Sequence, residues 1–448
     1  MDSILIDDII LHDVRFDTST TLSGSDARSK SPDYSCVYIV IKTNNINLNG
    51  YSLVFTLGKG NSVIKSAINE YIPLLKNNTL EYITTNFRYI CNKLTNDQQM
   101  CWIGPDKGAS HMAAGGLINC IWDLWAKYVN KPLWKLISDM PSKQLISLLD
   151  FNYMDKVLKE SDALHILDEN LDTRNDRIND VENDGLEAYT TSIGWSGYSN
   201  ELIKEKCKKS LDEGFKNFKI KVGSDLKNDM DRSSLIRKEI GWNKRLMMDS
   251  NGIWDYNNAR TNMIFLKKFN PYWIEEPTHP DDIIAHSDLQ KDLYPIKIAT
   301  GEQCPNKIMF KQFIQLGGFS ILQTDINRLA GLNEWLVVAL MAKKYGIPIC
   351  THAGGVGLCQ MAAHLAAIDY ICIANTTEDR ITEYVEHLQE HFVNPVKICD
   401  GAYVLPSNIG LGLELKKNAI DKYSYPNGTF WKNNNIIKNK LWCEPLNL

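Results

Sequence analysis

From about residue 187 onward, short strand-like runs alternate with helix-length segments, and this alternation constrains the fold more than any other feature of the chain. The strand pattern is carried by "AYTTSI", "FKIKVG", "RLMMDSN", "YWIEEP", "PIKIATGE", "ILQTDIN", "PICTHAG" and "DYICIAN". A (β/α)8 barrel is the simplest architecture for such a pattern. A doubly wound open sheet fits less well, because no strand leads into a G-x-G-x-x-G turn and "GGVGLCQ" lacks the third glycine.

The rest of the chain divides into further sections by its local patterns. Residues 1–136 combine strands such as "CVYIVIKTN" with the helical pattern of "ASHMAAGGLINCIWDLWAKYVNKP", which indicates an α+β domain, interrupted by a polar loop at about 17–36. Residues 137–186 are interpreted as a linker and a polar helical insertion. We expect the barrel over 187–400, and a segment over 401–448 that packs back on the N-terminal domain and ends in a partly disordered tail.

Composition excludes several classes of partner. With a net charge of -5 and a pI near 6.0, the chain has no basic face for nucleic acid or an anionic membrane, so a small molecule is the expected partner. The start "MDSILIDDII" lacks signal-peptide and transit-peptide features, which predicts a cytoplasmic protein, with a mitochondrial location left open. The scattered cysteines indicate buried thiols. A zinc site at Cys350, His352 and Cys359 is disfavoured, because no second ligand pair has zinc-site spacing.

Polar residues follow several of the predicted strands at the point where each strand ends. They are Lys221, Asp249, Glu275, Glu302, Asp325 and His352. Their spacing of about 23 to 28 residues corresponds to one βα unit each, so they should meet at the C-terminal rim of the barrel. Asp249, Glu275 and Glu302 would repel one another unless a cation joined them, and an oxygen-only ligand set suits Mg²⁺. Each acid taken alone would fit a salt bridge or a helix cap equally well.

Candidate acid/base groups stand on both sides of the three carboxylates. Lys221 shares one strand face with Lys219, although such a lysine pair alone is more often a solvated face. Asp325 is placed to accept a hydrogen bond from one nitrogen of His352, which raises the basicity of the other nitrogen. Two bases beside a metal suit the removal of a proton α to a carboxylate.

This constellation resembles the enolase superfamily and, within its mandelate racemase-like branch, the L-fuconate dehydratases, up to about residue 405. The resemblance rests on "PDYS", "FTLGKG", "WIGPDKG", "WDLWAK", "YTTS", "FKIKVG", "WIEEPT", "ATGEQC", "HAGGVGLC" and "EYVEHLQEHF". It implies a capping domain, a modified (β/α)7β-like barrel, one Mg²⁺ per subunit and a homo-oligomer. The implied reaction is the dehydration of L-fuconate to 2-dehydro-3-deoxy-L-fuconate. Another acid-sugar dehydratase, a 2-epimerase or a non-catalytic binding relative stay open as alternatives.

The resemblance also implies a role for particular residues. The implied catalytic residues are Lys221, His352 and Asp325, and the implied Mg²⁺ ligands are Asp249, Glu275 and Glu302. The implied substrate-binding residues are Gly24, Ser25, Asp26, Tyr34, Lys219, Asn251, Glu275, Glu302 and Glu383. For Glu383 this role rests on the resemblance alone, because "TEYVEHLQEH" is interpreted as a surface helix. The loop "GSDARSKSPDYS" departs most from the family pattern, with Arg28, Ser29 and Lys30 beside the contact positions.

The implied chemistry divides the acid/base work between two groups. Lys221 is expected to take the 2-proton and therefore to need a lowered pKa, which a nearby Mg²⁺ and Lys219 would favour. His352, as imidazolium, is expected to protonate the departing 3-hydroxyl.

Overall fold

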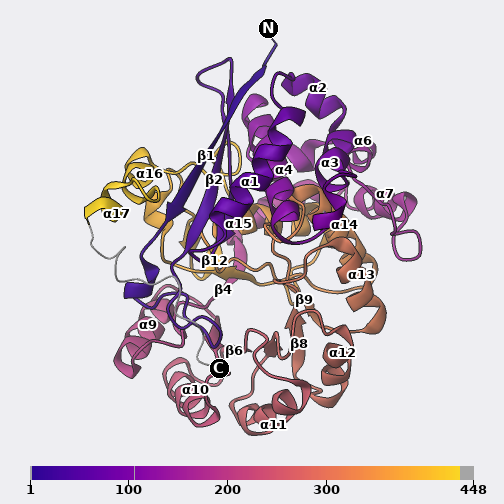
Figure 1. Cartoon of the computed structure of the whole chain (residues 1–448). Helices are drawn as coiled ribbons and strands as arrows, with labels where there is room; N and C mark the ends of the chain where they lie inside the picture. The colour runs from indigo at the N-terminus through magenta and orange to yellow at the C-terminus, as the bar shows by residue number, and fades with distance from the viewer. Residues whose placement is uncertain (1–2, 105, 434–448) are drawn as a thin grey trace.

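The computed structural model describes residues 3–104 and 106–433 (Figure 1). Its N-terminal part holds an antiparallel sheet in the order β1 (Ile6–Arg15), β2 (Ser35–Thr43) and β3 (Gly50–Thr56). The long helix α4 (Gly108–Tyr128) packs on this sheet. The contact is close because Gly116 of α4 has no side chain: a Cβ there would lie 2.6 Å from Val54. The polar loop that begins after β1 leads into β2, beside the barrel.

Further helices complete the N-terminal part and lead into the barrel. They are α1 (Asn61–Tyr71), α2 (Leu80–Thr85), α3 (Phe87–Thr95), α5 (Leu133–Asp139), α6 (Ser142–Ser147), α7 (Glu160–Asp168) and α8 (Arg174–Asp184). Of these, α1, α3 and α5 pack on α4. The polar helix α8 is mostly exposed, but Arg177 is buried and its Nη2 donates a 2.8 Å hydrogen bond to Ile371 O. This bond ties the polar insertion to the C-terminal half of the chain.

The C-terminal half is built on a parallel sheet in the order β4-β5-β6-β7-β8-β9, with β10 on the other side of β4. The strands are β4 (Leu186–Thr190), β5 (Asn217–Lys221), β6 (Arg245–Asp249), β7 (Trp273–Glu275), β8 (Lys297–Thr300), β9 (Ile321–Leu322) and β10 (Thr382–Tyr384). The helices between them are α9 (Asn200–Asp212), α10 (Leu226–Ile240), α11 (Tyr256–Leu266), α12 (Ile283–Asp292), α13 (Lys307–Leu316), α14 (Gly331–Lys344) and α15 (Leu358–Ile368). Lys221 pairs with Asp249 in the sheet register and Asp249 with Glu275, so these strand ends are level.

Residues 348–352 bridge the two ends of this sheet. Cys350 N–H donates a 2.9 Å hydrogen bond to Leu322 O of β9, and Glu383 N–H of β10 donates a 3.2 Å bond to Thr351 O. The segment therefore occupies the place of a strand between α14 and α15. With it, the element order is the (β/α)7β arrangement that the family resemblance implied.

The stretch "DYICIAN" is not the last strand, contrary to the expectation. Asp369–Ala374 form a π-helical segment, η5, directly after α15, and the last strand is β10. Ile371, Cys372 and Ile373 are all buried, and a short run that is apolar on every side fits a buried strand and a buried helix equally well.

The end of the described chain returns to the N-terminal sheet. The strand β12 (Ala402–Tyr403), paired with β11 (Ile398–Cys399), adds antiparallel to β4. The helices α16 (Lys417–Tyr423) and α17 (Thr429–Asn433) lie next to β1 in Figure 1, where Tyr425 N–H donates a 2.7 Å bond to Asp13 O. The tail was expected to be partly disordered from about residue 418, and its residues 434–448 lie outside the described residues. Among the helices of the described chain, none has the length and apolarity needed to cross a bilayer.

Candidate active site

A cavity of about 650 Å³ lies between the carboxyl ends of the barrel strands and the N-terminal domain. Barrel residues on its wall include Lys221, Asn251, Glu276, Glu302, Asp325, His352 and Glu383. The N-terminal domain contributes Gly24, Asp26, Tyr34, Phe55 and Met112. The level strand ends of the barrel therefore form the floor of a site that the N-terminal domain covers.

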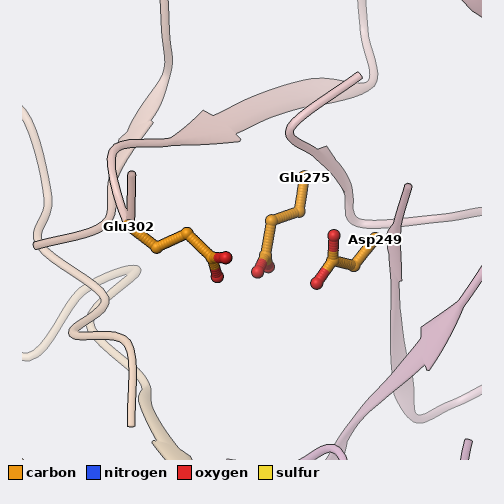
Figure 2. Close-up of side chains that lie close together, drawn as sticks. All are labelled: Asp249, Glu275 and Glu302. Atoms are coloured by element: carbon orange, nitrogen blue, oxygen red, sulfur yellow. The ribbon is translucent and has the colours of Figure 1, made fainter. Parts of the chain in front are cut away.

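Three carboxylates from successive strands converge beside this cavity: Glu302 lines it, and Asp249 and Glu275 are fully buried next to Glu302. Asp249 ends β6, Glu275 ends β7 and Glu302 follows β8, and one oxygen from each lies within 4.8 Å of the others. Figure 2 shows the three carboxylate groups turned toward one another. Burial and the charge of Asp249 raise the pKa of Glu275 to about 8. Glu302 Oε2 is buried and accepts no hydrogen bond from any described residue.

This donor set fits a hard divalent cation. It offers oxygen ligands only, and the crowded like charges need a positive charge between them. The described residues hold no comparable group at Cys350, His352 and Cys359. The Cys350 thiol instead faces Asp379 O and the Cys359 thiol faces Ala353 O, so the zinc alternative has no support in the fold.

The two lysines of β5 both lie within 4 Å of Asp249 Oδ2, but their nearest carboxylates differ. Lys219 is fully buried, and its Nζ lies 2.6 Å from Glu275 Oε1 and 3.0 Å from Glu383 Oε1. Lys221 Nζ lies 2.5 Å from Asp249 Oδ2. Burial alone would lower the pKa of Lys221, but the charge of Asp249 outweighs it and raises this pKa above its ordinary value. This is the opposite direction to the lowered pKa expected for a base at this position.

His352 is held between carboxylates at the other side of the three metal-ligand candidates. Its Nδ1 lies 2.7 Å from Asp325 Oδ2, and its Nε2 lies 3.4 Å from Glu302 Oε2 and 3.7 Å from Glu383 Oε2. Burial alone would lower the pKa of His352, but Glu302 and the hydrogen bond to Asp325 outweigh it and raise the pKa to about 9. This direction favours the protonated imidazole, which is the form that can act as an acid.

Glu383 lies on the short strand β10 and is 1% exposed, so its interpretation as a surface helix residue was wrong. Its Oε2 accepts a 2.9 Å hydrogen bond from Ala353 N–H, and its Oε1 accepts one from the Thr191 hydroxyl. Asn251 lines the same cavity with a backbone φ of 49°, and among the described residues its Oδ1 has no hydrogen-bond partner.

The loop after β1 places its residues in two different environments. Gly24, Asp26 and Tyr34 line the cavity, and Asp26 Oδ1 accepts hydrogen bonds from Arg28 N–H at 2.7 Å and Ser29 N–H at 2.6 Å. Ser25 is fully buried, and its Oγ accepts a 2.9 Å bond from Gly197 N–H in the loop after β4. Ser25 thus fastens the loop to the barrel, whereas its neighbours face the cavity.

Glu276 is a wall residue that the sequence reasoning missed. Along a regular strand it would point to the face opposite Glu275, but its backbone has a φ of 42° and its side chain lines the cavity. Both of its carboxyl oxygens are buried without a hydrogen-bond partner in the described part of the chain. Burial and the charge of Glu302 raise the pKa of Glu276 well above its usual range. The doublet "EE" at a strand end was the available signal.

Comparison with known proteins places this chain in a family. Residues 202–419 match the family described as "Enolase C-terminal domain-like". The chain is 47% identical to mitochondrial enolase superfamily member 1 from Xenopus laevis over 94% of this chain and 95% of that protein. It is 40% identical to L-galactonate dehydratase from Hypocrea jecorina over 96% of this chain and 97% of that protein. The crystal structure of human mitochondrial enolase superfamily member 1 matches with a TM-score of 0.95 at 45% identity, covering 96% of this chain and 98% of that one. The chain therefore belongs to the enolase superfamily, and acid-sugar dehydration occurs among its relatives.

Proposed function

We propose that this protein is a Mg²⁺-dependent acid-sugar dehydratase that converts L-fuconate to 2-dehydro-3-deoxy-L-fuconate and water. The observation that carries the proposal is a group of three carboxylates within 4.8 Å, with Lys221 beside it on one strand and His352 beside it on another. The similarity to an L-galactonate dehydratase supports the reaction class. L-Fuconate is L-galactonate without its 6-hydroxyl group, so both acids present the same reacting carbons.

Asp249, Glu275 and Glu302 would hold the Mg²⁺. When bound, Mg²⁺ supplies positive charge that stabilises negative charge developing on the substrate carboxylate and offsets the charge of Asp249 beside Lys221. Glu275 is fixed for this task, because its Oε2 accepts a 2.8 Å hydrogen bond from Gln323 Nε2 and a 3.1 Å bond from Trp273 Nε1. Partners of this kind orient a ligand before the ion arrives.

The remaining polar residues would share the chemistry. Lys219 Nζ, between Glu275 and Glu383, binds the substrate carboxylate. Lys221, as the neutral amine, takes the proton from C2. His352, which Asp325 orients, gives its Nε2 proton to the 3-hydroxyl, so that the C3–O bond breaks and water leaves. The resulting enol becomes the 2-keto acid.

Selectivity would come from buried polar groups that the protein leaves unpaired. Asn251 Oδ1 and the carboxyl group of Glu276 have no partner among the described residues. A site built to bond substrate hydroxyls discriminates strongly against analogues that lack them, because its own groups then stay unpaired. Tyr34 and Asp26 on the cover line the same cavity and would contact the far end of the sugar.

The test is product analysis with Mg²⁺ on L-fuconate, L-galactonate and a panel of other sugar acids. We expect a keto acid that has lost one water, with activity lost in Lys221→Ala and in His352→Ala. Lys227→Ala, in which a lysine of α10 that is 87% exposed is removed, is the matched control and should keep full activity. Exchange of the 2-proton without loss of mass would instead show a 2-epimerase. Ligand binding without turnover on any acid would show a non-catalytic relative.

Two further expectations extend the proposal. We propose a homo-oligomer, which sedimentation velocity would measure. The predicted cytoplasmic location stands beside relatives that are named mitochondrial, and cell fractionation would distinguish the two compartments.

A further inference from the structure

A second cavity, of about 360 Å³, lies between helices α3 and α4 of the N-terminal domain and the loops that lead into α13 and α14. Its wall includes Glu334, in the first turn of α14, whose side chain is 10% exposed. A carboxylate removed from water to this degree needs partners that balance its charge.

The Glu334 carboxylate has three such partners from three segments of the chain. Its Oε1 accepts a 2.8 Å hydrogen bond from Lys307 N–H at the start of α13. Its Oε2 accepts a 2.8 Å bond from Ala330 N–H, just before α14, and lies 2.8 Å from His111 Nε2 of α4. One side chain thus joins two barrel loops to the long helix of the covering domain.

Each of these segments continues into the wall of the active cavity. The loop that leads into α13 at Lys307 contains Glu302, and the loop that ends at Ala330 contains Asp325. On α4, His111 precedes Met112, which lines the active cavity itself. Glu334 therefore bonds the two loops that carry a metal-ligand candidate and the partner of His352, and the helix that carries part of the cover.

Close packing makes this junction rigid. A Cβ at Gly115 of α4 would lie 2.5 Å from Leu329 O, so the helix and the loop are in backbone contact. Leu332 N–H donates a 2.9 Å hydrogen bond to Asn119 Oδ1 of α4. A shift of α4 would therefore displace the loop that carries Asp325.

Asn333 and Lys307, two other polar residues of the second cavity, also have partners. Asn333 Oδ1 accepts a 2.6 Å bond from Trp122 Nε1, and its Nδ2 donates a 2.9 Å bond to Leu148 O. Lys307 Nζ lies 2.7 Å from Asp150 Oδ2. Because these groups already have hydrogen-bond or ion-pair partners within the protein, the cavity wall is a structural junction between the two domains rather than a ligand-binding site.

We infer that Glu334 is a positioning residue, which holds the loops of Glu302 and Asp325 in register with helix α4. The inference rests on the proposed function for the roles of these two residues. It predicts that removing the hydrogen bonds of Glu334 shifts the loops of Glu302 and Asp325 in the active cavity, although Glu334 itself does not contact the substrate.

The test compares Glu334→Gln with Asp150→Asn, a matched control in the same cavity. The Asp150 carboxylate accepts its bond from Lys307 Nζ, whereas Glu334 accepts one from the backbone N–H of Lys307. The substitution at Glu334 keeps the size of the side chain but removes its charge and turns an N–H group toward one of the three donors. Mn²⁺ affinity is measured by calorimetry on the folded full-length protein. We expect about a tenfold weaker affinity in Glu334→Gln, equal to about 1.4 kcal/mol, and the wild-type affinity in Asp150→Asn.

Hydrogen exchange provides a readout that needs neither metal nor sugar. We expect faster exchange over 302–308 and 325–330 in Glu334→Gln, and wild-type exchange there in Asp150→Asn. If Glu334→Gln does not fold, His111→Gln removes the α4 contact alone and should speed exchange in the first turn of α4. The inference fails if Glu334→Gln matches Asp150→Asn in both affinity and exchange. If wild-type protein binds no Mn²⁺, the proposed function loses its metal, and the exchange data alone decide the role of Glu334.

Discussion

The two cavities differ in how completely their buried polar groups are paired. In the active cavity, Glu276 and Asn251 keep buried atoms for which the described chain offers no partner. In the second cavity, the carboxylate of Glu334 has three partners and the amide of Asn333 has two. Arg88 Nε is unpaired within the described residues there, but this side chain is 36% exposed. Since folding penalises an unpaired buried group, such groups persist where a ligand completes them, which separates a binding site from a structural joint.

The largest change in stability is expected in the second cavity, where the buried carboxylate of Glu334 has three hydrogen-bond or ion-pair partners. Glu334→Ala should lower the free energy of unfolding by about 3–5 kcal/mol, because it leaves His111 and two backbone N–H groups without their common acceptor. Urea denaturation measures this loss. Glu160→Ala, which removes a half-exposed carboxylate near Arg88, should cost less than about 1 kcal/mol. An equal decrease in the free energy of unfolding of Glu334→Ala and Glu160→Ala would contradict the distinction between a buried structural junction and a surface ion pair.

In the active cavity, removal of a buried negative charge should weaken metal binding and leave the stability of the fold unchanged or higher. Glu302→Gln removes one of three converging negative charges, so the affinity for Mg²⁺ or Mn²⁺ should fall about 100-fold, near 2.7 kcal/mol. With a chelator present to remove metal, the melting temperature of Glu302→Gln should equal or exceed that of the wild type, because the repulsion between the charge of residue 302 and the charges of Asp249 and Glu275 is relieved. Calorimetry and thermal melts measure both quantities. A strong loss of stability in chelator would show that Glu302 is structural.

Two buried histidines repeat the contrast. His352 is surrounded by carboxylates, which raise its pKa to about 9, whereas burial lowers the pKa of His364 to about 3. His364 Nδ1 accepts a 3.3 Å hydrogen bond from Trp134 N–H, and this bond requires an unprotonated nitrogen. In the unfolded chain His364 has an ordinary histidine pKa near 6.5, so between about pH 3 and pH 6.5 it is protonated there but not in the folded chain.

Because of His364, the free energy of unfolding should therefore decrease as the pH is lowered. Because the unfolded state binds more protons below about pH 6.5, His364 should remove about 2 kcal/mol between pH 7 and pH 5. His364→Gln keeps an acceptor for Trp134 N–H and should lack this part of the pH dependence. Denaturation of both proteins at the two pH values gives the difference. Identical pH profiles would mean that His364 titrates normally in the fold.

The sequence predicted most of the barrel but not its last strand. Lys221, Asp249 and Glu275 end strands that show a clear pattern, because alternation and flanking turns agree there. The strand β10 is three residues long and carries a charged residue, so it has no local strand signal. Only pairing with β4 and the hydrogen bond from Glu383 N–H to Thr351 O define it. Such tertiary pairing has no signature in a short polar run.

The site was predicted in the same uneven way. The three carboxylates could be found from spacing alone, because barrel geometry converts spacing along the chain into proximity. Glu276 was missed, because its side chain reaches the cavity through a positive φ at a residue type that rarely adopts one, and the second acid of the doublet at the strand end does not reveal this. Glu334 also had no signal, because an acid in the first turn of a helix is ordinarily a solvated cap. Its partners come from distant segments that only the fold brings together.

The smallest expected effect is a gain of stability in the active cavity. Glu276→Met removes two buried oxygens that have no partner in the described chain, and should raise the free energy of unfolding by about 1 kcal/mol at pH 7 while reducing activity. The pKa of Glu276 is raised by burial and by Glu302, so the unfolded state binds fewer protons than the folded state above about pH 4.5 and wild-type stability falls as pH rises.

The gain from Glu276→Met should therefore shrink when denaturation is repeated at pH 4, where the acid is protonated in both states. Glu276→Gln, which loses the charge but stays polar and unpaired, should give a smaller gain at pH 7. A loss of more than about 1 kcal/mol in Glu276→Met would mean that this carboxyl group stabilises the fold. The active cavity would then be held together by its polar wall in the same way as the second cavity, and unpaired atoms would no longer distinguish the site that binds from the joint that supports it.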